Sequence, residues 1–167
     1  MSENTTRPTI VVGVDGSEPS VLALRWAAAL APLFGNPTIK ATTTWEFYLA
    51  PGTFYPAQWD LAQDAHILCT EAISKAFGDT PPPQLEIVVH QGPAAKTLIE
   101  ASNDASLLVL GSRGYGGFKG LLLGAVSSTV AEHAKCAVLL AHGTALPPGL
   151  ELPTASPAEP HGVRRNA

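Results

Sequence analysis

Short apolar runs alternate along the chain with longer segments in which apolar residues recur at helical spacing. Five runs, rich in leucine or β-branched side chains, predict strands at residues 9–15, 38–45, 85–90, 107–110 and 137–141. Four segments between them predict helices at residues 17–34, 59–77, 93–102 and 126–134. This alternation predicts an α/β fold, in which a parallel sheet with right-handed crossovers carries helices on both faces.

Capping and turn residues support these boundaries. Ser17 can cap the first helix, whose first turn contains Glu18 and Pro19, and the Gly-Asn-Pro sequence at 35–37 ends it. The second predicted strand contains three successive threonines at 42–44, which suit a pleated surface, and we expect this strand to lie inside the sheet.

A long loop with aromatic side chains follows the second strand at residues 46–58. It contains Phe47, Tyr48, Phe54 and Tyr55. These rings could cover a bound ligand, or they could close the end of the hydrophobic core. The sequence favours neither alternative.

Composition predicts one globular domain. The chain has 167 residues, of which 46% are hydrophobic and 14% are charged. We expect a flexible N-terminus at 1–7, a domain at 8–143 and a disordered, proline-rich tail at 144–167.

Charge and hydropathy argue against several partners. The net charge of −4 and the pI near 5.7 give no basic excess for a nucleic acid. The residues before the first strand do not resemble a secretory signal, and no apolar run is long enough to span a membrane. We therefore expect a cytoplasmic protein that binds neither nucleic acid nor membrane.

Cysteine and histidine residues form no recognisable catalytic or metal-binding pattern. Cys69 and Cys136 are far apart and are expected to be small buried side chains in a reduced compartment. The five histidines are dispersed. His90 comes near a strand end and could reach a site there, although a structural role is the simpler interpretation.

The segment with the strongest chemical character joins the fourth strand to the last helix. The candidate binding residues in it are Gly111, Ser112, Arg113, Gly114, Gly124, Ala125, Val126 and Ser127. Glycine after a buried strand lets the backbone approach a phosphate, and the first amides of the next helix present free N–H groups and a partial positive charge. The alternative is that these glycines only form a tight turn.

Two well-known phosphate loops are absent from the sequence. No Gly-Lys-Ser/Thr occurs, and the glycines do not follow the Gly-x-Gly-x-x-Gly spacing of dinucleotide-binding folds. Instead, Gly111-x-x-Gly114 is followed by nine residues and then Gly124-Ala-Val-Ser. This order and spacing resemble the ATP-binding motif of the universal stress protein family. The opening segment Val-Asp-Gly-Ser at 14–17 resembles the family as well, and the likeness extends over about 8–141.

The resemblance implies an adenine-nucleotide alpha-hydrolase-like fold with a single five-stranded sheet of order 3-2-1-4-5. It also implies ATP as cofactor, with or without Mg²⁺, and a homodimer, which we expect to form through the last strand because that strand is an apolar edge. By the same resemblance the three motif glycines line the phosphates and ribose, and Ser127 hydrogen-bonds a phosphate. Asp15 lies at the nucleoside end, the Thr44 backbone contacts adenine, and Gly13 leaves room beside it.

One residue departs from the family pattern. Ala125 stands where serine or threonine is usual, so the chain keeps the backbone N–H but lacks a hydroxyl. We expect weak nucleotide binding for this reason. The leading interpretation is an ATP-binding regulatory or stress-response protein that is not a fast enzyme. A nucleotide-free dimeric interaction module and a slow ATPase or autophosphorylating protein, with Ser127 or Ser128 as acceptor, remain alternatives.

Overall fold

The computed structural model of the chain describes residues 7–47, 51–52, 54, 56, 59–114 and 122–154. The strands within this part are β1 (Thr9–Gly13), β2 (Thr38–Trp45), β3 (Leu85–Gln91), β4 (Leu107–Gly111) and β5 (Ala137–Ala141). The helices are α1 (Glu18–Leu30), α2 (Leu61–Phe77), α3 (Ala94–Ala101) and α4 (Ala125–His133), with short 3-10 turns at Ala31–Phe34 and Ser102–Asp104.

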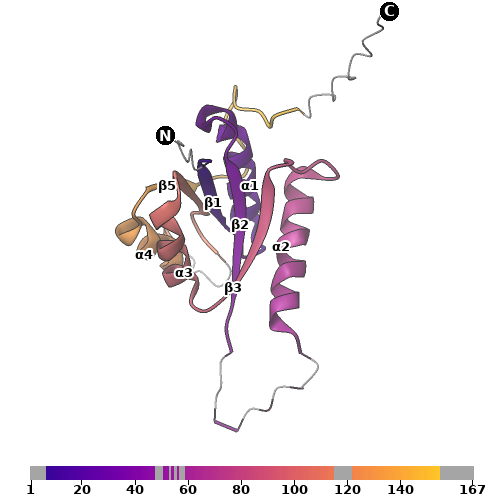
Figure 1. Cartoon of the computed structure of the whole chain (residues 1–167), viewed down its shortest axis with the longest axis vertical. Coiled ribbons are helices and arrows are strands. Elements are labelled where there is room, and N and C mark those ends of the chain that lie inside the picture. Colours follow the sequence, from indigo (N-terminus) through magenta and orange to yellow (C-terminus); the bar gives the residue numbers. More distant parts are fainter. Residues whose placement is uncertain are drawn as a thin grey trace, which may run out of the picture.

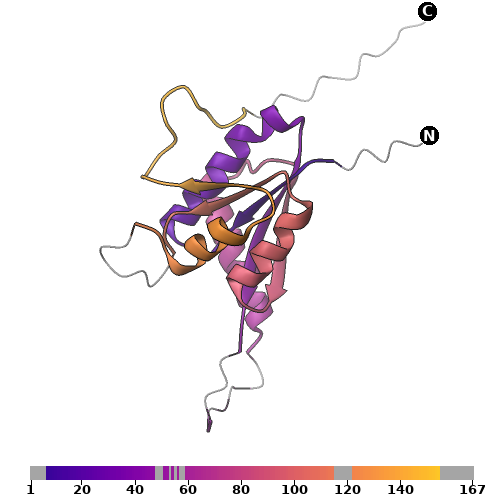
Figure 2. The ribbon, with the colours of Figure 1, turned by 90° about the vertical axis from the view of Figure 1, so that its left-hand side faces the viewer.

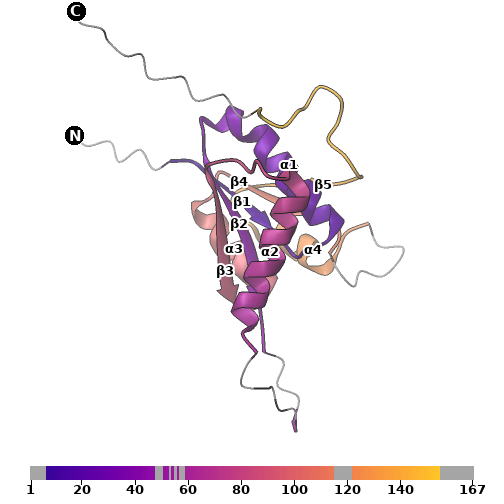
Figure 3. The same ribbon diagram turned by 90° about the vertical axis from the view of Figure 1, so that its right-hand side faces the viewer.

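These strands form one parallel sheet of order β3-β2-β1-β4-β5, which confirms the predicted fold and strand order. Helices α1 and α2 cover one face, and α3 and α4 cover the other (Figure 1). Figure 2 shows the face with α3 and α4, and Figure 3 shows the face with α1 and α2.

Each face of the sheet has its own hydrophobic core, because side chains alternate along a strand. Val12 of β1 and Ile39 of β2 are fully buried under α1 and α2. Val11 of β1 points the other way and packs with Leu98 of α3 and Val130 of α4.

The first strand and the first helix both end earlier than the sequence predicted. The strand ends at Gly13 because Asp15 starts a turn, in which its carboxylate accepts the Ser17 N–H at 3.0 Å. The α-helix stops at Leu30 and continues as a 3-10 turn. Pro32 explains this change, since proline has no N–H to extend the α-helical ladder.

The threonine-rich strand is confirmed inside the sheet, between β3 and β1. Thr42 and Thr43 are each only 3% exposed. By contrast, β3 and β5 are the two edges of the sheet, and most of β5 is half-buried.

The first part of the predicted tail packs on the domain. Residues 144–154 contain no helix or strand, but Leu146 and Leu152 contact the core on the α1 side. In Figure 3 this yellow segment leaves β5 and returns toward α1. The many prolines explain the absence of a helix or strand, and the two leucines supply the apolar contacts with the domain. Residues 155–167, and 1–6 of the predicted N-terminal segment, lie outside the described residues.

The two cysteines differ in burial. Cys69 is buried, as predicted, and this burial raises the pKa of its thiol to about 12. Cys136 is only half-buried. No helix in the described part of the chain is long and apolar enough to cross a membrane.

Candidate functional site

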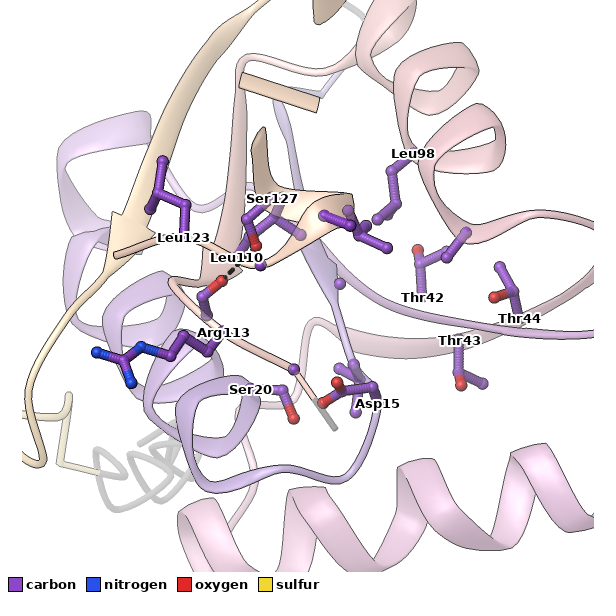
Figure 4. A pocket seen from close by; sticks show the side chains of 18 of the residues that line it. Asp15, Ser20, Thr42, Thr43, Thr44, Leu98, Leu110, Arg113, Leu123 and Ser127 are labelled. Carbon is purple, nitrogen blue, oxygen red and sulfur yellow. Dashed lines mark hydrogen bonds between the residues drawn. The ribbon is translucent and has the colours of Figure 1, made fainter. Parts of the chain in front are cut away.

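A cavity of about 410 Å³ lies where β1, β2 and β4 end at their carboxyl edge. Figure 4 shows it between these strand ends, with side chains from the neighbouring helices around it. This is the position where ligands bind in doubly wound sheets. Of the predicted site residues, Gly13, Asp15, Thr44, Gly111, Arg113, Gly114, Gly124, Ala125, Val126 and Ser127 line the cavity.

Ser112 is the predicted site residue that does not line the cavity. It is 5% exposed, and its backbone closes the base of the loop. Its N–H donates to the Ala141 carbonyl of β5, and its carbonyl accepts the Gly124 N–H, both at 2.9 Å. Ser112 therefore holds the two ends of the loop together.

The N-terminus of α4 faces the cavity without a side-chain cap. Its N-cap is Gly124, and the first bond of the helix runs from the Ser128 N–H to the Gly124 carbonyl at 2.9 Å. Within the part of the chain that the structure describes, the N–H groups of Ala125, Val126 and Ser127 have no hydrogen-bond partner. Such a helix end favours an anion through its free donors and its partial positive charge.

The Ser127 hydroxyl connects α4 to the end of β4. It donates to the Gly111 carbonyl at 2.7 Å, shown as a dashed line in Figure 4, and the residue is 5% exposed. The hydroxyl proton is therefore engaged inside the protein. In this arrangement Ser127 positions the first turn of α4, and it would have to release Gly111 before it could donate to a phosphate.

Asp15 lies between the end of β1 and the start of the loop. One carboxylate oxygen accepts the N–H and the hydroxyl of Ser17. The other would collide with a Cβ atom at Gly114, so only glycine allows this approach. The carboxylate therefore borders the start of the loop at Gly114.

Two other glycines are explained by packing. A Cβ atom at Gly111 would lie 2.6 Å from Cβ and 2.7 Å from the carbonyl carbon of Pro19, so this glycine lets α1 approach β4. At Gly13 a Cβ atom would meet the side chain of Leu110 and come within 3.2 Å of Leu98. Leu98 and Leu110 therefore occupy the space where a side chain at residue 13 would lie, and with Gly13 they form an apolar wall of the cavity.

The charges around the cavity are few. Asp15 is the acidic residue and Arg113 the basic residue among the described lining residues. The Arg113 side chain is exposed and points away from Asp15 (Figure 4). Lys119 and the glycine pair at 116–117, which were expected to add charge and pliability, lie outside the described residues. No group of three or more potential metal ligands occurs in the described residues.

Other lining residues were not predicted from the sequence. They are Val14, Ser20, Thr42, Thr43, Leu68, Ala94, Leu98, Leu110 and Leu123. The alternation of side chains along β2 could have indicated Thr42, which lies two residues before Thr44. No local pattern identifies Leu68 or Leu98, because α2 and α3 reach the cavity only through tertiary packing.

Neither His90 nor the described phenylalanines of the aromatic loop line the cavity. His90 lies beside Thr44 in the register of β2 and β3, but it is exposed and does not line the cavity. In the aromatic loop, Phe47 and Phe54 are 45% and 96% exposed, and neither lines the cavity. Tyr48 and Tyr55 lie outside the described residues.

The Universal stress protein family model matches residues 6–142, which include the strand ends and the loop that form the cavity. The chain belongs to the universal stress protein family. It is 32% identical over 151 residues to a universal stress protein of Mycobacterium tuberculosis. The aligned region covers 85% of this chain and 50% of that protein. It is also 30% identical over 149 residues to a universal stress protein of Mycolicibacterium smegmatis. That aligned region covers 86% of this chain and 51% of the relative. This universal stress protein chain thus spans about half the length of the curated relatives it matches.

Solved universal stress protein structures share the fold. One is a UspA from Lactobacillus plantarum, with a TM-score of 0.63, 20% identity, and coverage of 82% of this chain and 99% of that chain. Another was solved in complex with cAMP; its TM-score is 0.61 at 26% identity, with coverage of 81% of this chain and 97% of that chain.

Proposed function

We propose that this protein binds an adenine nucleotide in the cavity and acts as a regulatory or stress-response protein in the cytoplasm. The observation that carries the proposal is the N-terminus of α4, where the N–H groups of residues 125–127 line a cavity and lack partners in the described chain. A phosphate placed there would satisfy these donors and lie at the positive end of the helix dipole.

The remainder of the cavity suits a nucleoside. Leu98 and Leu110 provide apolar surface for a base, while Asp15 and the threonines of β2 provide hydrogen-bonding groups. Ligand sites commonly combine an apolar lining with a few polar groups in this way. The relative solved with cAMP supports an adenine nucleotide as the first ligand to test, alongside ATP.

Magnesium fits this proposal as a companion of the phosphates. Mg²⁺ in nucleotide sites is usually held by one or two carboxylates together with phosphate oxygens. Asp15 borders the loop through Gly114 and would supply the carboxylate. The ion would then offset the repulsion between Asp15 and a phosphate.

Assembly is proposed to occur through β5. This strand is an edge of the sheet and has the apolar sequence AVLLA. An unpaired edge of this kind is a template for pairing with a second copy, and a two-fold axis would satisfy both edges. Sedimentation velocity over a dilution series should show a dimer, and a monomer at every concentration would exclude this assembly.

The experiment that tests nucleotide binding uses the purified full chain. Denatured protein is analysed by anion exchange for released nucleotide, and the native protein is titrated with ATP, cAMP and AMP by calorimetry with and without magnesium. We expect binding at micromolar or weaker affinity. If no nucleotide is released and none produces heat up to millimolar concentration, the protein is instead an interaction module with an unused cavity, an alternative that Ala125 favours.

Turnover is expected to be slow. Rapid phosphoryl transfer needs a group that positions the attacking water or hydroxyl, in addition to metal ligands. Asp15 is the carboxylate among the described lining residues, and the Ser127 hydroxyl is hydrogen-bonded to Gly111. We therefore expect a rate far below the roughly 1 to 1000 per second of typical enzymes. A steady-state phosphate release above about one per second would instead favour the enzyme alternative.

A further inference from the structure

The cavity extends to both sides of the sheet at the end of β2. Thr42 and Thr44 point to one side of the strand and Thr43 points to the other, and Figure 4 shows this alternation. On the Thr43 side the lining continues with Leu68 of α2 and Val14. The cavity therefore has a small extension between β2 and α2 in addition to the space under α3.

The Thr43 hydroxyl has no hydrogen-bond partner among the described residues, although the residue is only 3% exposed. Thr42 is equally buried, but its hydroxyl donates to the Lys40 carbonyl at 3.4 Å. Buried polar side chains in native proteins are almost always hydrogen-bonded to protein or to water, so the partner of the Thr43 hydroxyl is expected to be a water molecule or a ligand in the cavity.

The same hydroxyl is not sealed inside the protein. Among the described residues, Trp26 Nε1 is a side-chain polar atom that is fully enclosed and has no hydrogen bond. Thr43 Oγ1 is not in this class, so part of its surface remains accessible. Because Thr43 lines the cavity, the open side of its hydroxyl borders the cavity. A ligand atom there can bond to the hydroxyl without moving the protein.

The strand order indicates which part of a nucleotide comes near Thr43. The α4 N-terminus follows β4, Asp15 follows β1, and Thr43 lies on β2, so the three features occupy successive strands. Neighbouring strands are about 4.8 Å apart, and Thr43 is therefore about 10 Å from the proposed phosphate position. This distance is comparable to the length of a nucleotide, so a nucleotide with its phosphate at α4 can reach β2 with its base.

We propose that Thr43 determines base specificity, and that its hydroxyl hydrogen-bonds a polar edge atom of the purine base while Leu68 and Val14 contact the ring. The inference rests on the proposed function, since it assumes that a nucleotide binds with its phosphate at α4. The proposed binding site would then include the Thr43 side chain of the interior strand β2, in addition to the loop that follows β4. A hydroxyl suits this position because it can donate to a ring nitrogen or accept from an amino group.

The test compares Thr43→Val with wild type by titration with AMP. Valine keeps the shape and the β-branch of threonine, so the strand and its packing are preserved. We expect AMP to bind about tenfold more weakly, which corresponds to about 1.4 kcal/mol. The melting temperature of the ligand-free variant should equal or exceed that of wild type, because the substitution removes a hydroxyl that has no partner.

Matched variants separate the hydroxyl from general effects on the strand. Thr38→Val changes the same residue type at the start of β2, outside the cavity, and should leave AMP affinity unchanged. Thr43→Ser keeps the hydroxyl and should bind AMP more tightly than Thr43→Val. Ribose 5-phosphate lacks the base, so Thr43→Val should not alter its affinity.

The outcomes distinguish the two proposals. If wild type binds neither AMP nor another adenine nucleotide, the proposed function is wrong and this inference falls with it. If wild type binds AMP and Thr43→Val binds it equally well, only the inference about Thr43 is wrong. If Thr43→Val weakens ribose 5-phosphate as much as AMP, the hydroxyl contacts the sugar and the assignment to the base is overturned.

Discussion

Helices α1 and α4 both begin at the carboxyl edge of the sheet, and their N-termini differ. Helix α1 follows β1 and is capped by Ser17, whose hydroxyl oxygen accepts the Ser20 N–H at 3.3 Å, with the acidic Glu18 in the first turn. Helix α4 follows β4, has Gly124 at the N-cap position, and has neither a side-chain cap nor an acidic residue in its first turn.

The difference shows why only one of these helix ends suits an anion. At α1 the protein supplies its own negative and hydrogen-bonding groups, including Asp15 beside Ser17. At α4 three N–H groups remain without partners in the described chain, so an external anion can fill the role that Ser17 has at α1. The same kind of helix end thus contributes to stability at α1 and is available to a ligand at α4.

The largest effect is expected from Gly114→Glu. The new side chain would begin where the Asp15 carboxylate lies and would add a second negative charge beside the proposed phosphate. Like charges placed together in this way cost several kcal/mol, so nucleotide affinity should fall by at least about two orders of magnitude in calorimetry. Ala131→Glu adds the same charge at an exposed position of α4 outside the cavity and is the control. Equal affinity in the two variants would show that the loop does not hold the phosphate.

A more specific change is Ala125→Pro, which removes one N–H from the start of α4. Proline is well tolerated at the first helical position, and Gly124 already has the extended conformation, φ −72° and ψ 162°, that precedes proline. A hydrogen bond to a charged group contributes about 1.5–3 kcal/mol, so affinity should fall by about one to two orders of magnitude. Thermal unfolding of the ligand-free protein should change little. An unchanged dissociation constant would remove this N–H from the binding site.

Ala125→Ser should have the opposite and smaller effect. It restores the hydroxyl that the family pattern has at this position, and a charge-assisted bond to the phosphate should tighten binding by up to about tenfold. The comparison of dissociation constants by calorimetry decides the outcome. If the affinity does not change, the side chain at this position points away from the ligand.

The smallest effect concerns α1. Ser17→Ala removes the cap and should lower the free energy of unfolding by about 1 kcal/mol, as measured by urea denaturation. Ala125→Pro in α4 should instead weaken nucleotide binding more than it lowers the free energy of unfolding. If both variants lost stability equally, the N-terminus of α4 would be as important for folding as that of α1.

Much of the fold could be predicted from the sequence because its determinants are local. The alternation of apolar strands and capped helices indicates the parallel sheet, and the glycines between β4 and α4 indicate the loop. The reasons for those glycines are less local. Gly111 allows the approach of Pro19, which lies far away in the sequence, and the space above Gly13 holds Leu110. Only the packing of α1 and β4 on one another reveals such roles.

The backbone elements around the candidate cavity were easier to predict from the sequence than the roles of its side chains. Helix N-termini and strand ends follow from element boundaries, and these located the cavity at the correct edge. The hydrogen bond from Ser127 to Gly111 depends on how α4 packs against β4, which no spacing of residues encodes. Thr43 was missed for a similar reason, because its burial and its lack of a partner are properties of the folded interior.

The cavity is lined by segments from β1, α1, β2, α2, α3, β4 and α4, so an occupant would touch most of the elements of the domain at once. A molecule that binds only the folded state raises its stability, by about 2.7 kcal/mol when present at a hundred times its dissociation constant. Chains that open rarely are degraded slowly. The lifetime of this protein in the cell would then depend on the supply of its ligand, and its abundance would act as a slow record of nucleotide levels.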